Sequence, residues 1–217
     1  MAASKCSYFL FFHSFSIELS FIKHKEYIDM AEYPREISVK KPNFSLRKPE
    51  LGFSVARDLF LAVDKNRNFF RPWLGWVDFV KSPEDEFEVA KSVAQNDTCK
   101  YFVYWYMCLV GMVGVVREDK SSRTMEVGYW LGQDVNGNGV MTQAVEQVQN
   151  LCFERGGANR VEIRCATENK KSRAIPERLN FKLDGVLRQA EILPSGIIHD
   201  VAVYSKLKSE WEKGKQK

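Results

Sequence analysis

The chain has 217 residues, of which 45% are hydrophobic and 28% charged, which is enough apolar material for a packed domain and excludes a wholly disordered protein. The net charge of +4 at pH 7 is too small to indicate nucleic-acid binding by itself. The five cysteines contain no C-x-x-C pair and indicate reduced thiols in a cytoplasmic protein. The three scattered histidines give no metal-binding spacing, so we expect no metal cofactor.

The N-terminal segment differs from the rest of the chain. Residues 8–12 form an apolar run (YFLFF) that is too short for a membrane span and lacks a clear signal cleavage site, so we expect no membrane association. A residual signal or anchor is the alternative, and Met30 is an alternative start. We predict a poorly ordered extension at 1–36, one domain at 37–211 and a charged tail at 212–217, with the residues after Ser209 solvated.

The first half of the chain is predicted to be mixed in secondary structure. Hydrophobic spacing and turn residues indicate an extended segment at 37–48, helices at 52–69 and 83–95, an aromatic loop at 69–76, and strands at 100–107 and 110–117. The two strands are rich in tyrosine, phenylalanine, tryptophan and valine, which favour pleated, half-buried positions.

In the second half, strands and helices alternate around a glycine-rich loop. The pattern predicts strands at 126–131, 161–165, 181–189 and 198–206, a loop at 133–139, and helices at 140–154 and 170–179. This order indicates an α/β protein of the mixed α+β kind, in which helices pack on a mixed sheet.

The glycine-rich loop is a candidate phosphate site. Its sequence, GQDVNGNG at 132–139, brings several backbone N–H groups and a helix N-terminus around one concavity, which binds phosphate without requiring a lysine. Asn-Gly occurs twice and also indicates a β-hairpin, but the residues that follow have helical spacing. We therefore predict a phosphate-binding loop.

Four longer segments carry a resemblance to a known family. They read AVDKNRNFFRPWLGWVDFVKSPED (62–85), EVGYWLGQDVNGNGVMTQAV (126–145), NRVEIRCATENKKSRAIPERLNFKLDGVLRQAE (159–191) and VYSKLKSEW (203–211). They resemble the GNAT superfamily of N-acetyltransferases, and most of all its RimJ/RimL branch, the ribosomal-protein N-terminal acetyltransferases. The resemblance implies one GNAT-type domain with a mostly antiparallel sheet of about six to seven strands, a splayed parallel pair, and acetyl-CoA as cosubstrate.

The resemblance also assigns residues to the cofactor. They are Tyr129, Trp130, Leu131, Asn136, Gly137, Asn138, Gly139, Val140 and Asn169. The backbone of 129–131 would pair with the pantothenate arm where the parallel strands part, the backbone of 136–140 would hold the phosphates, and Asn169 would bond the pantetheine arm. In the family motif [Q/R]-x-x-G-x-[G/A] the first position falls here on Asp134, with Gln133 one residue early, so the resemblance assigns no side chain to the phosphates.

Acetyl transfer to an amine needs an acceptor for the amine proton and a hydrogen bond for the departing thiolate. By resemblance, Glu191 is the general base, and a solvated glutamate at a strand end is the alternative. Glu126 is the second candidate base and a substrate-side residue, with a structural ion pair as its alternative. By resemblance, Ser172 lies near the cofactor sulfur and orients the thiolate, whereas a capping role in the first helical turn is the alternative.

Aromatic residues are candidates for the acceptor side. Trp73 and Trp76, with Phe70, would line the acceptor pocket, although such clusters also form ordinary cores. The pair His199-Asp200 resembles one near the active site of this branch, and a structural turn is the alternative. At Asn180 the family usually has glycine, so we expect a left-handed helix terminus there.

Three functions remain open from the sequence. The first is acetylation of a protein N-terminal amine, with a ribosomal protein as partner and no direct nucleic-acid contact. The second is the same chemistry on a small amine such as a polyamine or an antibiotic. The third is a non-catalytic acyl-CoA-binding module, which the joint presence of Glu191, Ser172 and Asn169 disfavours. Formation of a homodimer is a family expectation only.

Overall fold

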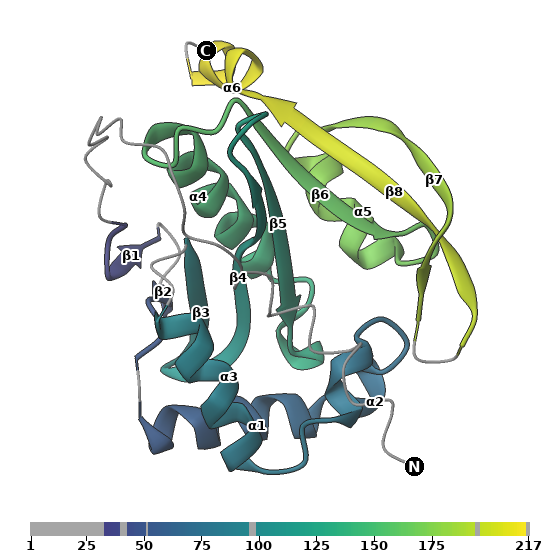
Figure 1. Ribbon diagram of the computed structural model, residues 1–217. Helices are drawn as coiled ribbons and strands as arrows, with labels where there is room; N and C mark the ends of the chain where they lie inside the picture. Colours follow the sequence, from purple (N-terminus) through teal and green to yellow (C-terminus); the bar gives the residue numbers. More distant parts are fainter. Residues whose placement is uncertain (1–32, 40–42, 51, 96–98, 194–195, 216–217) are drawn as a thin grey trace, which may run out of the picture.

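The computed structural model describes residues 33–39, 43–50, 52–95, 99–193 and 196–215, so most of the predicted N-terminal extension lies outside the described residues. The elements, in chain order (Figure 1), are β1 (Glu36–Ser38), β2 (Phe44–Arg47), α1 (Phe53–Lys65), α2 (Arg67–Phe70), η2 (Gly75–Asp78), α3 (Pro83–Gln95), β3 (Lys100–Trp105), β4 (Cys108–Asp119), β5 (Thr124–Leu131), η3 (Gln133–Val135), α4 (Val140–Glu154), β6 (Arg160–Ala166), α5 (Lys170–Arg178), β7 (Lys182–Ile192), β8 (Ile198–Leu207) and α6 (Lys208–Lys215).

One mixed sheet organises the described chain. Its eight strands run in the order β1-β2-β3-β4-β5-β6-β8-β7, and every neighbouring pair is antiparallel except β5 and β6. This confirms the predicted mostly antiparallel sheet with one parallel pair. The sheet has more strands than expected because the segment predicted as extended contains both β1 and β2.

The parallel pair separates along its length. β5 and β6 are paired only from Thr124–Arg160 to Glu126–Glu162, and the rest of β5, from residue 127 to 131, has no partner in β6. Figure 1 shows the two strands diverging toward α2 and η3. A backbone edge that is open on this side can accept hydrogen bonds from a ligand laid between the strands.

Two apolar clusters lie on opposite faces of the sheet. On one face Met125, Val127 and Leu131 of β5 pack with the buried side of α4. On the other face Trp130 packs with residues of α1 and α2. Successive side chains of a strand point to opposite faces of the sheet, so β5 contributes both to the cluster under α4 and to the cluster under α1 and α2.

Two of the expected boundaries were wrong for reasons of local geometry. The helix expected to reach residue 69 stops at Lys65, because the Asn66 side chain donates to the Ala62 carbonyl and accepts from the Gln133 backbone N–H, 2.8 Å away in each case. The strand expected to reach residue 107 ends at Trp105, because Tyr106 and Met107 have positive φ and form the turn into β4. The left-handed conformation expected at Asn180 is confirmed by its φ of 57°.

The expectation of a solvated segment after Ser209 was wrong at Trp211, which lies in helix α6 and is only 9% exposed, whereas residues 212–215 are exposed as expected. The Trp211 ring lies 5.2 Å from the ring of Phe153, and its indole N–H donates to Asn150 Oδ1 at 2.7 Å. A single large aromatic side chain therefore docks a charged sequence onto α4.

Helix α3 carries a buried carboxylic acid. Glu86 is 1% exposed, and its Oε1 has no hydrogen-bond partner among the described residues. Burial raises the pKa of Glu86 to about 7, with Asp85 adding to the shift and Arg67 opposing it. Since the pKa is higher in the folded state, this group contributes stability that is full below its ordinary pKa of 4.5 and is lost as the pH rises toward 7.

We therefore expect Glu86→Gln to stabilise the protein in mildly alkaline solution. The amide keeps the size of the side chain and cannot ionise, so the free energy of unfolding should rise by up to about 3 kcal/mol at pH 8. At pH 5 the gain should be much smaller, because the native acid is already protonated there. Urea denaturation of both proteins at the two pH values measures this, and a variant less stable than the parent at pH 8 would contradict it.

Candidate active site

The glycine-rich loop at the open end of β5 forms a concave backbone turn. Gly137 and Gly139 have φ values of 82° and 70°, and a Cβ placed on either residue would meet no atom within 4 Å. Gly139 is the N-cap of α4 and no side chain caps that helix. The first backbone N–H groups of α4 are thus left for another acceptor, as the sequence predicted.

Buried polar atoms without partners gather at the same place. Of the three such side-chain atoms among the described residues, two are Asn136 Nδ2 in the loop and Gln143 Oε1 in the following turn of α4. A donor and an acceptor left unpaired in a folded protein cost free energy unless a ligand or water satisfies them. Together with the open turn, they fit a ligand that carries phosphate oxygens and N–H or hydroxyl groups.

Helix α5 lies beside the first turn of α4, where Arg178 Nη1 donates to Thr142 Oγ1 at 3.5 Å. Asn169 is the N-cap of α5, and the Asn169 Oδ1 accepts the Ser172 backbone N–H at 3.1 Å. Ser172 is therefore not the cap, and its hydroxyl is available for other bonds. The Ser172 Oγ donates to the Tyr129 hydroxyl at 3.2 Å, and that hydroxyl donates to the Ser172 carbonyl at 3.0 Å. These bonds join β5 to α5 across the gap left by the diverging strands.

Burial shifts the titration of the groups beside Ser172. Burial raises the pKa of Tyr129 well above its ordinary value, despite the opposing hydrogen bond to Ser172. Burial likewise raises the pKa of the Cys165 thiol to about 11, while a hydrogen bond with Ser172 lowers it and the charge of Glu191 raises it.

Glu191 lies within β7, opposite His199 of β8. The strand runs farther than predicted, so Glu191 is half-buried in the sheet rather than solvated at its end. Burial raises the pKa of Glu191, the charge of His199 lowers it, and the charge of Glu126 raises it. His199 itself pairs through Nδ1 with Glu168 Oε2 at 3.0 Å. Among the described residues, no hydrogen bond or ion pair engages the Glu191 carboxylate.

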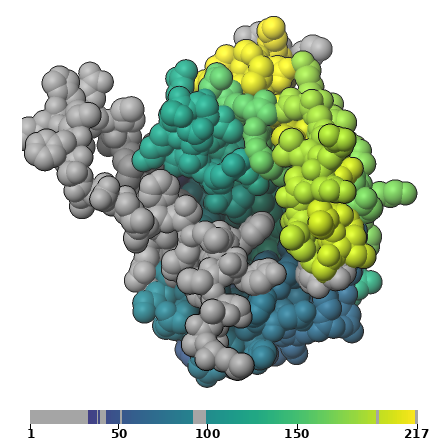
Figure 2. Space-filling model, turned by 45° about the vertical axis from the view of Figure 1, so that its right-hand side comes forward, coloured from purple at the N-terminus to yellow at the C-terminus, as the bar shows by residue number. Residues whose placement is uncertain are grey.

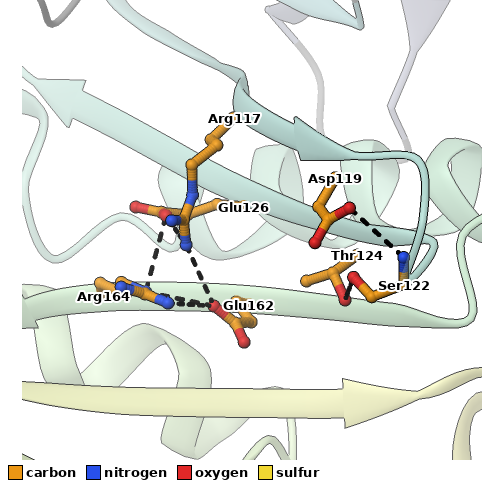
Figure 3. A pocket seen from close by; sticks show the side chains of 7 residues that line it. All are labelled: Arg117, Asp119, Ser122, Thr124, Glu126, Glu162 and Arg164. Carbon is orange, nitrogen blue, oxygen red and sulfur yellow. Dashed lines mark hydrogen bonds and ion pairs between the residues drawn. The ribbon is translucent and has the colours of Figure 1, made fainter.

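Glu126 lies in a different environment, at the point where β5 and β6 part. Its Oε2 is 3.0 Å from Arg117 Nη2 of β4 and 3.5 Å from Arg164 Nε of β6. Arg164 also bonds Glu162 Oε2, at 2.9 Å. Figure 3 shows these four side chains turned toward one another. They line a polar hollow of about 230 Å³ together with Asp119, Ser122 and Thr124.

The two glutamates therefore differ as proton acceptors. Burial raises the pKa of Glu126, but Arg117 and Arg164 act against that shift and hold the charge in an ion-pair network. Glu191 has no such partner and needs to break no ion pair to take a proton. The structural alternative for Glu126 is thus supported, and the geometry favours Glu191 as the base. The arginines of this network were not found from the sequence, although Glu162 and Arg164 alternate with apolar residues of β6.

The aromatic residues separate into two groups. The ring of Trp76 lies 6.2 Å from that of Trp130, and the ring of Phe70 lies 5.4 Å from it. Trp76 and Trp130 also border a small apolar hollow of about 50 Å³ beside Gly128. Trp73 lies half-buried in the turn after α2, outside this ring cluster. In Figure 2 the sheet is recessed between the blue α1–η2 segment and the yellow-green β7–β8 hairpin.

Comparisons with known proteins agree with this geometry. The acetyltransferase (GNAT) domain family matches residues 39–182. The ribosomal-protein-serine acetyltransferase of Escherichia coli is 28% identical over 171 residues, which cover 77% of this chain and 95% of that protein. The protein YdaF of Bacillus subtilis is 39% identical over 104 residues, which are 48% of this chain and only 56% of YdaF.

Solved structures match over most of the chain. The microcin C7 self-immunity acetyltransferase MccE, in complex with acetyl-CoA and AMP, matches with a TM-score of 0.71 and 29% identity over 82% of this chain and 99% of that one. The RimL ribosomal L7/L12 α-N-protein acetyltransferase, in complex with coenzyme A, matches with a TM-score of 0.72 and 25% identity over 78% of this chain and 97% of that one.

The chain belongs to the acetyltransferase (GNAT) family, the class that the splayed sheet and the glycine-rich loop define. Within this family it is related to the RimL ribosomal-protein N-acetyltransferases, which confirms the resemblance seen in its sequence. In the described part of the chain, no helix is long and apolar enough to cross a membrane, and no group of three histidine, cysteine or acidic residues is arranged to hold a metal ion.

Proposed function

We propose that this protein transfers the acetyl group of acetyl-CoA to a primary amine, with the N-terminal α-amine of a protein as the acceptor. One observation carries the proposal. Among the described residues, the buried atoms Asn136 Nδ2 and Gln143 Oε1 have no partner, and they lie at the uncapped start of α4, where β5 has parted from β6. An open backbone turn with unmet donors and acceptors suits the phosphates of acetyl-CoA, and Glu191 and Ser172 are the proposed base and hydroxyl donor.

Each residue then has a distinct task. The backbone of 136–140 and the start of α4 bind the phosphates, and the free edge of β5 from Tyr129 to Leu131 orients the extended arm. Acetyl-CoA supplies an activated thioester. Glu191 takes the proton of the amine, directly or through water, and the Ser172 hydroxyl turns from Tyr129 to donate a hydrogen bond to the departing sulfur. Asn169 fixes Ser172 by capping α5.

The relatives support a protein acceptor. The Escherichia coli relative is a ribosomal-protein-serine acetyltransferase, and RimL acts on the ribosomal protein L7/L12. On the acceptor side we place the apolar hollow that Trp76 and Trp130 border beside Gly128. MccE is an acetyltransferase whose structure holds AMP beside acetyl-CoA, and a small molecule is therefore the competing class of acceptor.

A thiol-release assay with acetyl-CoA tests the proposal. The acceptor panel holds N-terminal peptides of ribosomal proteins, the same peptides with blocked α-amines, polyamines, aminoglycosides and aminoacyl nucleotides. We expect thiol release only with free-amine peptides, and mass spectrometry should show one added acetyl group at the α-amine. Release with only a small amine would favour the second function. Tight CoA binding without release for any amine would indicate a non-catalytic module.

Ser172→Ala should have a moderate effect on this reaction. The change removes one hydrogen bond to the leaving sulfur but leaves the base and the phosphate loop intact, so kcat should fall about tenfold. Thiol release at saturating acetyl-CoA measures the change. Ser172→Thr, which keeps a hydroxyl, should retain more activity than Ser172→Ala, and equal loss in both variants would contradict a hydrogen-bonding role.

A further inference from the structure

The phosphate loop contains an acidic residue in an unfavourable place. Asp134 lies in η3, three residues before Gly137, so their Cα atoms are at most about 11 Å apart along the chain. Its side chain is 69% exposed. A carboxylate within that range repels the phosphates of a bound nucleotide at low ionic strength, where the screening length is about 30 Å at 0.01 M salt.

A lysine from another element lies against this carboxylate. Lys65, the last residue of α1, places its Nζ 2.6 Å from Asp134 Oδ2. The hydrogen bond and the charge of Asp134 both raise the pKa of Lys65, so the lysine keeps its proton near neutral pH. The chain position of Lys65 is 69 residues before its partner, so the pair is a product of the tertiary fold.

The residue after Lys65 ties the end of α1 to the loop. Asn66 is 9% exposed, and its Oδ1 accepts the backbone N–H of Gln133 at 2.8 Å. A Cβ on Gly132 would approach Asn66 Nδ2 to 3.2 Å, so the contact is close on that side also. The end of α1 is therefore bonded to the residue that precedes Asp134, and Lys65 remains beside the loop.

From this arrangement we infer that Lys65 is a cofactor-affinity residue, which cancels the charge of Asp134 so that the loop can accept the phosphates of acetyl-CoA. The inference rests on the proposed cofactor site and adds to it a side chain from α1. It differs from a purely structural ion pair in one respect. If the pair only holds the loop in shape, removing either partner weakens ligand binding; if it balances charge, removing the two partners has opposite effects.

A double-mutant cycle separates these cases. The dissociation constant of CoA is measured by isothermal titration calorimetry at low salt for the parent protein, Lys65→Gln, Asp134→Asn and the double variant. Lys65→Gln exposes the carboxylate and should raise the dissociation constant about three- to tenfold. Asp134→Asn frees the lysine and should lower it by a similar factor. The double variant should bind CoA about as the parent does, and both single effects should shrink in 0.5 M salt.

Lys182→Gln is the matched control. Lys182 is also an exposed lysine in a close pair, with its Nζ 2.5 Å from Glu210 Oε1, but it joins β7 to α6 rather than to the loop. It should leave the dissociation constant of CoA unchanged. Melting curves without ligand check that each variant is folded. Weaker binding in both single variants, or no change in either, overturns the inference while CoA binding by the parent still supports the cofactor site. Failure of the parent to bind CoA overturns the proposed function itself.

Discussion

Glu191→Gln is expected to lower kcat by about 10²- to 10⁴-fold at neutral pH, the usual cost of removing a general base. The amide keeps the size of the side chain but cannot take the proton of the amine. Since Glu191 forms no ion pair among the described residues, its removal should break no structural interaction of that kind. The affinity for CoA should hardly change, because the phosphates are held by the backbone of a different element.

The pH dependence of kcat provides a second test of Glu191 as the base. Burial raises the pKa of Glu191, so the parent protein should lose kcat as the pH falls through that value and the base becomes protonated. The variant should lack this acidic limb, and its deficit should shrink at high pH, where more of the amine arrives deprotonated. Glu126→Gln is the comparison, and it should affect kcat less than Glu191→Gln does.

Full activity of Glu191→Gln at neutral pH would show that another group accepts the proton of the amine. A larger loss of kcat in Glu126→Gln would then identify Glu126 as the base. Its ion pairs with Arg117 and Arg164 would make it a weaker base without preventing it from taking the proton. Thermal melting of both variants is needed alongside kinetics, because Glu126 also neutralises part of an ion-pair network and its loss leaves two arginines without one partner.

Gly139→Val is expected to abolish measurable CoA binding, a loss of at least about 100-fold. Gly139 has a φ of 70°, a conformation that costs a β-branched residue about 1–2 kcal/mol or more. A steric clash within the protein is not the cause, because a Cβ there would enter open space. That space is where the phosphates are proposed to lie, so the side chain would both distort the turn and occupy the site. Gly137→Val should act in the same way.

Gly157→Val separates the two contributions. Gly157 has a φ of 65° and equally open surroundings, but it follows the C-terminal end of α4. It should therefore lose similar stability on substitution and keep normal affinity for CoA, as measured by calorimetry and by the shift in melting temperature that CoA produces. Normal CoA binding by both loop variants would show that the phosphates lie elsewhere.

Local sequence patterns predicted most of the helices, strands and turns of this protein. The spacing of apolar residues predicted α4 and the strands beside it, since side-chain periodicity follows directly from backbone geometry. The left-handed positions at Gly137, Gly139 and Asn180 were also predictable, because these residues tolerate positive φ. The family resemblance added the parallel pair and its separation, which no single segment encodes. Fold and class were therefore available before the structure.

The tertiary structure alone decided which charges meet. Arg117 and Arg164 reach Glu126 from neighbouring strands, whereas no described residue forms an ion pair with Glu191 on β7, and this difference ranks the two candidate bases. Lys65 forms an ion pair with Asp134, and Trp211 packs against Phe153, although the partners are far apart in the sequence. The physical reason is the same in each case. Periodicity and turn preferences act over a few residues, but ion pairing and burial depend on distances in space that only the packed sheet and helices set.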